Sequence, residues 1–123
     1  MSSFGKRIRP AVDAELEAAG AQEAFGDSRA SFRHLERAHV LGQASTAQHV
    51  RVHVQMFLWA LRHRVFREAR GQVLRIVGAA TKTALGWVPT GNTGGANVSP
   101  FKPMPIPDDL RRVLTEAHSA TKR

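Results

Sequence analysis

Apolar residues recur at every third or fourth position from residue 32 to residue 84, and this spacing constrains the fold more than any other feature of the sequence. Positions at this spacing lie on one face of an α-helix, whereas a half-buried strand would show alternation. The clearest stretch comprises Val50, Val54, Phe57, Leu58, Leu61 and Val65, and the same period continues through Ala69, Val73, Ile76, Val77, Ala80 and Ala84. The sequence therefore predicts an all-α protein, a small bundle of four to five helices.

Helix start and stop signals divide the first part of the chain. Pro10 stands just ahead of a predicted amphipathic helix at residues 11–25. Asp27 then supplies an N-cap for a second helix, predicted at residues 28–41 and ended by Gly42.

The third and fourth predicted helices follow directly. Ser45, with Gln48 three residues later, is a capping box that opens the third helix. Neither a glycine nor a proline marks where this helix ends, and we place the break before the fourth helix near Arg64.

Residues 87–107 differ in composition from everything before them. They are rich in glycine, proline and asparagine, which suit neither a helix nor a strand, so they predict a long loop wrapped over the bundle. Proline and two acids then open a last helix at residues 108–118. We expect a single domain over residues 1–123, with its helical core at residues 10–86.

Composition excludes several classes of protein. The 123 residues include no cysteine, which removes disulfides, cysteine-based zinc sites, iron–sulfur clusters and thiol catalysis. No apolar run approaches the roughly 20 residues that span a bilayer, and the N-terminal residues lack the apolar stretch of a signal peptide. We therefore expect a cytoplasmic protein with no membrane partner.

Residues 26–41 resemble the second half of a tetratricopeptide repeat, in which a glycine–aspartate turn precedes small and large residues at helical spacing. Ser31, Leu35 and Ala38 stand at the small, large and small positions, and His39 departs from the aliphatic residue usual at its place. The resemblance implies a helical hairpin and leaves a protein-interaction module open as one function.

Histidines gather in the hairpin that the second and third predicted helices form. His49 and His53 are four residues apart and share one helix face, while Glu36 and His39 are three apart and are neighbours on the other helix. An antiparallel hairpin brings the two pairs together, so the sequence predicts a metal site with these four residues as ligands. Imidazole and carboxylate suit a divalent transition metal, with zinc or iron as the first candidates.

Two other interpretations of these residues stay open. Helical histidines are often half-buried structural residues, and Glu36 has arginines beside it with which it could form an ion pair. If Glu36 acts as a general base, metal-assisted hydrolysis becomes the reaction, so the sequence leaves open whether the protein is an enzyme. His34 is predicted to point away from the cluster, unless it supports the metal ligands from behind or binds a ligand of its own.

The segment G-N-T-G-G-A-N at residues 91–97 is the second polar feature. Its glycines allow a close approach of the backbone, and its amide and hydroxyl side chains form hydrogen bonds. We predict that Asn92, Thr93 or Asn97 comes within hydrogen-bonding reach of the histidines and orients an imidazole. The alternative is an ordered loop on the far side of the bundle, whose side chains satisfy backbone groups.

The middle of the chain is strongly basic. The net charge is +8, and only two carboxylates, Glu36 and Glu68, occur from residue 28 to residue 107. An alternative function is therefore binding of an anionic small molecule or of nucleic acid, for which the candidate residues are Arg62, Arg64, Arg67 and Arg70. Such a run is also common on a solvated helix face.

Three polar stretches taken together resemble a known family. They are H-L-E-R-A-H at residues 34–39, H-V-R-V-H at residues 49–53 and G-N-T-G-G-A-N-V-S-P-F at residues 91–101. The family consists of small, uncharacterised bacterial proteins with a domain of unknown function, and the resemblance spans roughly residues 10–115. It implies a stand-alone bacterial domain of about this length and carries over no activity.

Overall fold

The structure, a computed structural model, describes residues 2–84, 94–95 and 103–119. These residues form five helices and no strand, which confirms the all-α prediction. The helices are α1 (Ser3–Ala24), α2 (Ser28–Gly42), α3 (Thr46–Arg62), α4 (Phe66–Ala84) and α5 (Asp108–Ser119). None of the described helices is long and apolar enough to cross a membrane.

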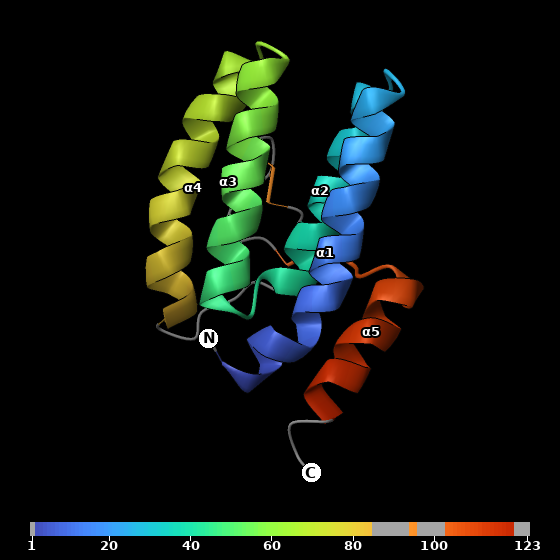
Figure 1. Cartoon of the computed structure of the whole chain (residues 1–123). Helices are drawn as coiled ribbons and strands as arrows, with labels where there is room; N and C mark the ends of the chain where they lie inside the picture. Colours follow the sequence, from blue (N-terminus) through green and yellow to red (C-terminus); the bar gives the residue numbers. More distant parts are fainter. Residues whose placement is uncertain (1, 85–93, 96–102, 120–123) are drawn as a thin grey trace.

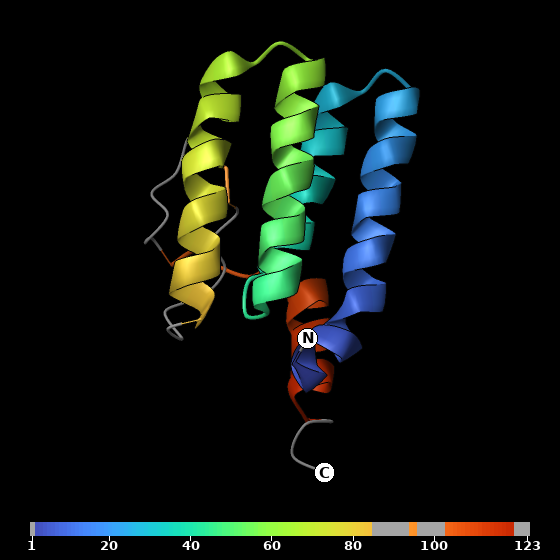
Figure 2. The same cartoon turned by 60° about the vertical axis from the view of Figure 1, so that its left-hand side comes forward.

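The first four helices lie side by side, and each runs antiparallel to the one before it (Figures 1 and 2). The main packing is between α1 and α2, between α3 and α4, and between α2 and α3. Helix α5 lies beyond one end of this array, against the N-terminal part of α1. Arg37 of α2 joins the two regions, because its guanidinium forms ion pairs with Glu15 of α1 and with Asp109 of α5.

The predicted caps are confirmed where α2 and α3 begin. The Asp27 carboxylate accepts a hydrogen bond from the Ala30 amide at 3.0 Å, and the Ser45 hydroxyl accepts one from the Gln48 amide at 3.4 Å. The predicted break near Arg64 is also confirmed. Arg64 connects α3 to α4 with a φ of 57°, so an arginine adopts a left-handed conformation that glycine usually supplies.

The predicted start of the first helix is wrong by about two turns. Helix α1 begins at Ser3, and Pro10 lies inside it rather than ahead of it. The first turn is capped by Ser2, whose hydroxyl accepts a hydrogen bond from the Gly5 amide, and Phe4 and Ile8 bury their side chains in the core. Figure 1 shows the helix bent in this region, as a proline without an amide hydrogen requires.

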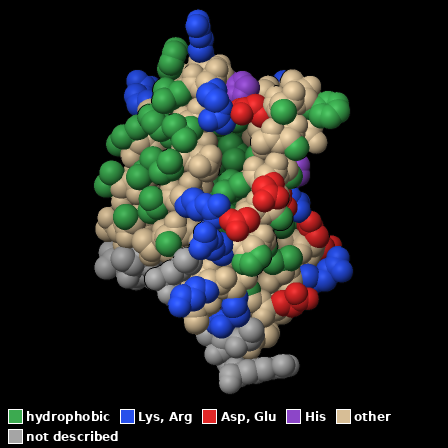
Figure 3. Space-filling view, viewed as in Figure 1, with side chains coloured by type: hydrophobic (Ala, Val, Ile, Leu, Met, Phe, Trp, Pro, Cys, Tyr) green, Lys and Arg blue, Asp and Glu red, His purple; other side chains and the backbone are tan. Residues whose placement is uncertain are grey.

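The apolar stripe of α3 and α4 is only partly buried. The buried positions of α3 are Gln48, His49, Val52, His53, Met56 and Ala60. The predicted stripe lies to one side of them, and Figure 3 shows hydrophobic side chains gathered over the outer face of the α3–α4 pair. The exposed side chains on these two helices and their connection are Leu58, Leu61, Val65, Phe66, Val73, Leu74 and Val77.

Candidate metal centre

Three histidines meet in the interior, between α2 and α3. His39 comes from α2, and His49 and His53 come from consecutive turns of α3. One ligand nitrogen from each ring lies within 4.8 Å of the others, and the ring centroids are 4.7–4.9 Å apart. Each side chain is at most 3% exposed. Among the described residues these three form the group that could hold a metal ion.

The short connection from α2 to α3 explains why the rings meet. Gly42 ends α2 close to the start of α3, and a Cβ atom at Gly42 would lie 3.0 Å from the Cβ atom of Gln48. This close approach lets His39 face His49 across the hairpin. The four-residue spacing then stacks His53 above His49 on the same face of α3.

His39 and His49 are hydrogen-bonded to each other. Their Nε2 atoms are 2.9 Å apart in a buried contact. Because a hydrogen bond between two imidazoles needs one donor and one acceptor, one of these two nitrogens carries a hydrogen and the other offers its lone pair. Both lone pairs would be available to a metal ion only after that hydrogen has left.

His53 has a different partner, on α4. Its Nδ1 atom lies 2.6 Å from Oε1 of Gln72, a side chain that is fully buried. The Nε2 atom of Gln72 donates in turn to a carboxylate oxygen of Glu68 at 3.0 Å and to the backbone oxygen of Gly94 at 2.9 Å. A chain of hydrogen bonds therefore runs from His53 through Gln72 of α4 to Gly94.

Gly94 closes one side of the histidine group. It has a φ of +82°, and a Cβ atom built on it would lie 2.4 Å from Cδ2 of His39. Arg75 holds this segment through hydrogen bonds from Nη1 to the backbone oxygens of Gly94 and Gly95 at 3.2 and 2.6 Å. Burial lowers the pKa of Arg75, which the nearby Glu68 carboxylate partly offsets.

The other predicted site residues have different positions. Glu36 is half-buried one turn before His39, and its role as a ligand stays a prediction. His34 bonds through Nδ1 to the Glu15 carboxylate of α1 at 2.7 Å. Asn92, Thr93 and Asn97 lie outside the described residues.

The basic residues near the α3–α4 connection are partly engaged in ion pairs. Arg62 and His63 both contact the Glu23 carboxylate of α1, at 3.1 and 2.7 Å. Burial raises the pKa of Glu23, but hydrogen bonds from His63 and Arg62 outweigh it, so the pKa lies below its usual value. The remaining candidates, Arg64, Arg67 and Arg70, are exposed.

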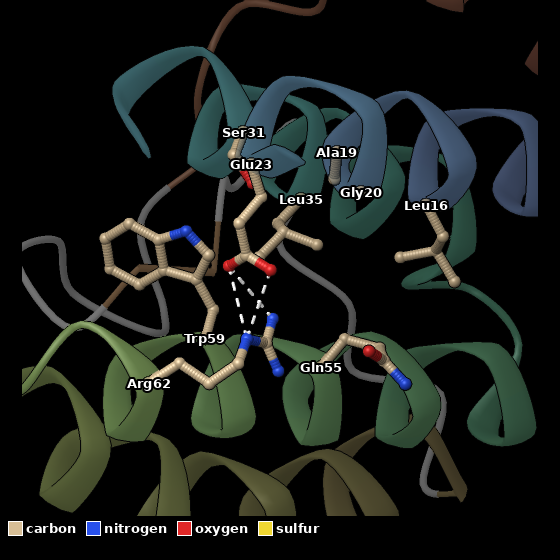
Figure 4. Close-up of a pocket in the computed structure, with 9 residues that line it drawn as sticks. All are labelled: Leu16, Ala19, Gly20, Glu23, Ser31, Leu35, Gln55, Trp59 and Arg62. Atoms are coloured by element: carbon tan, nitrogen blue, oxygen red, sulfur yellow. Dashed lines mark hydrogen bonds and ion pairs between the residues drawn. The ribbon is translucent and has the colours of Figure 1, made fainter. Parts of the chain in front are cut away.

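A small hollow lies between α1, α2 and α3, where the Glu23–Arg62 pair forms part of its lining (Figure 4). Its volume is about 70 Å³, which is enough to hold water. Leu16, Leu35 and Trp59 also line it, and it contains none of the three clustered histidines. Ser31, Gln55 and the Glu23–Arg62 pair make part of its lining polar, which suits water.

Gln72 is the site residue that sequence reasoning missed. It is a polar residue among alanine, valine and isoleucine in α4, four positions after Glu68. Gln72 lies on the buried face of α4, in line with Ala69 and Ala79. A glutamine at such a position indicates a polar site in the interior, because a buried amide needs hydrogen-bond partners.

Over residues 6–114 the chain matches the family described as "Protein of unknown function (DUF3703)", and it belongs to that family. This confirms the resemblance to an uncharacterised domain family. No curated protein and no solved structure matches the chain. The likeness to a tetratricopeptide half-repeat therefore stays a prediction.

Proposed function

We propose that this member of the DUF3703 family binds a divalent transition metal ion through the imidazoles of His39, His49 and His53. The observation that carries the proposal is the convergence of three buried imidazoles, with ligand nitrogens within 4.8 Å of one another. Neutral imidazole is a common ligand of transition metal ions, and three nitrogens this close together can bind one ion jointly.

The ligand type narrows the choice of ion. Imidazole nitrogen suits zinc, iron, nickel and copper, whereas magnesium and calcium prefer oxygen ligands. Zinc and iron are therefore our first candidates. Because three neutral rings leave the charge of the ion uncompensated in a buried site, a nearby carboxylate would favour binding.

The role of Glu36 determines whether the proposed centre is a structural or a catalytic metal site. Catalytic zinc sites hold the ion with three protein ligands and keep one position open, while structural sites use four. If Glu36 is a fourth ligand, the centre resembles a structural site. If Glu36 is instead a base beside an open position, it resembles a hydrolytic one. A Glu36→Gln variant separates these cases, since loss of a ligand weakens metal binding and loss of a base does not.

The direct test is metal analysis of protein made without a histidine tag. Protein freed of metal is dialysed against Zn²⁺ or Co²⁺, and the bound metal is measured by mass spectrometry. We expect about one ion per chain for the wild type and far less for a His39→Ala/His49→Ala variant. Co²⁺ should also give the visible absorption of a site with nitrogen ligands.

A matched control removes two histidines that lie outside the group. His34 bonds to Glu15, and His118 stacks on Phe4 with ring centroids 4.3 Å apart. A His34→Ala/His118→Ala variant should keep the metal content of the wild type. Equal metal content in both double variants would show that the histidine group binds no metal, and would leave these residues a structural role.

A further inference from the structure

We infer that Gln72 is the positioning residue of this centre, because it fixes the tautomer of His53 so that the Nε2 atom is presented as the ligand. The inference rests on the proposed metal-binding function. Its basis is the buried amide of Gln72, in which the oxygen and both hydrogens of the nitrogen have partners.

The orientation of the Gln72 amide follows from its partners. Its Nε2 atom is 3.0 Å from a Glu68 carboxylate oxygen and 2.9 Å from the Gly94 backbone oxygen. Both of these oxygens are acceptors, so the nitrogen end of the amide faces them and uses both of its hydrogens. The oxygen end is left facing His53 and can only accept.

The tautomer of His53 follows from this orientation. With Oε1 of Gln72 2.6 Å away and able only to accept, Nδ1 of His53 must carry the hydrogen and donate it. The neutral ring then has its lone pair on Nε2. His39 and His49 contact each other through their own Nε2 atoms, so the same nitrogen of all three rings serves the group.

Gln72 also ties the centre to the segment that closes it. The amide that orients His53 holds the carbonyl of Gly94, and the backbone of Gly94 leaves no room for a Cβ atom beside His39. Gln72 therefore orients the His53 ring on one side of the histidine group and holds Gly94 on the other side. Partners of this kind typically change metal affinity by about 10- to 100-fold when removed.

The experiment has two readouts, and the first needs no metal. In metal-free protein at pH 8, the ¹⁵N signals of the His53 ring report which nitrogen is protonated. We expect the hydrogen on Nδ1 in the wild type, and a shift toward the Nε2–H form in Gln72→Leu. In Gln72→Glu the carboxylate still accepts from Nδ1 but cannot donate to Gly94, so the Nδ1–H form should persist.

The second readout is the dissociation constant for Zn²⁺, measured by competition with a chelator. We expect Gln72→Leu to bind about 10- to 100-fold more weakly than the wild type. Gln72→Glu retains the acceptor for His53 but loses the donors to Glu68 and Gly94, so it should bind Zn²⁺ more tightly than Gln72→Leu. Gln55→Leu is the matched control, since Gln55 is half-buried on α3 and lines the separate hollow of Figure 4.

The outcomes distinguish this inference from the function on which it rests. If the wild-type His53 ring carries its hydrogen on Nε2, or if Gln72→Leu changes neither readout, Gln72 is not a positioning residue, even when the protein binds metal through its histidines. If the tautomers behave as expected but wild-type protein takes up no metal, the proposed function is wrong. Circular dichroism of each variant shows whether the helices are intact.

Discussion

The Nε2 atoms of His39 and His49 lie 2.9 Å apart, although the two residues belong to different helices and are ten positions apart in the sequence. The contact forms because α2 ends and α3 begins within a few residues, so the hairpin itself brings the rings together. A metal ion and a hydrogen compete for the same two nitrogens. Metal binding at this centre should therefore weaken as the solution becomes more acidic.

Metal should raise the thermal stability of the protein. An ion that binds only the folded chain adds about 2.7 kcal/mol at a free concentration 100 times its Kd. For a domain of this length that corresponds to a rise in Tm of about 10 °C. Calorimetry with Zn²⁺, followed by addition of EDTA, measures the rise and its reversal. A His39→Ala/His49→Ala variant should show no rise, and an equal rise there would place the binding elsewhere.

Replacing Gly94 by alanine should cost more than replacing Gly26. Both glycines have positive φ angles, +82° and +88°, so each alanine pays about 1 kcal/mol of backbone strain. Only at Gly94 does the new Cβ atom meet His39, at 2.4 Å, while nothing lies within 4 Å at Gly26. We expect Gly94→Ala to lower the free energy of unfolding by about 2–4 kcal/mol, and to weaken Zn²⁺ binding. Urea unfolding of both variants checks this, and equal losses would contradict the close contact.

Replacing Arg64 by glycine should stabilise the protein. Arg64 has a φ of 57°, and glycine removes a strain of about 1 kcal/mol at such a position. The matched variant Arg70→Gly removes the same charge inside α4, where glycine costs about 1 kcal/mol of helix stability. Urea unfolding should therefore show changes of opposite sign, and a loss of stability in both variants would argue against strain at Arg64.

Glu23 should make the stability of the fold depend on pH. Its pKa in the folded protein lies below the ordinary value of 4.5, so its ion pairs contribute stability above that value and lose it as the pH falls through the lowered pKa. Glu23→Gln should lower the free energy of unfolding by about 1 kcal/mol at pH 7, and by much less at pH 3. Denaturant unfolding at the two pH values measures the difference. Glu17→Gln, at an exposed acid of the same helix, is the control for removing one negative charge from α1.

The histidine group could be predicted from the sequence because it depends on local geometry. The spacing of His49 and His53 places them on one helix face, and the turn signals around Gly42 and Ser45 predict the hairpin that brings His39 to them. Only helix periodicity and one short connection are needed. No interaction between distant parts of the chain enters the prediction.

Which side of α3 and α4 is buried could not be predicted in the same way. Apolar periodicity selects Leu58, Leu61 and Val65, yet α3 turns His49 and His53 inward and leaves those three residues exposed. Burial of imidazoles and of Gln72 becomes favourable only when their hydrogen-bond partners are in place. Those partners come from three helices and from Gly94, so a pattern within one helix cannot reveal them.

The three histidines span only fifteen consecutive positions, from residue 39 to residue 53, and the hairpin that contains them has already fixed their backbones. Binding of an ion therefore costs little chain entropy, because folding has already ordered the backbone of the three ligands. In such a preorganised centre, selectivity is set by how well the size and bonding angles of the ion suit rings that cannot rearrange. The close approach of the Gly94 backbone also limits how far the His39 ring could shift to suit a larger ion.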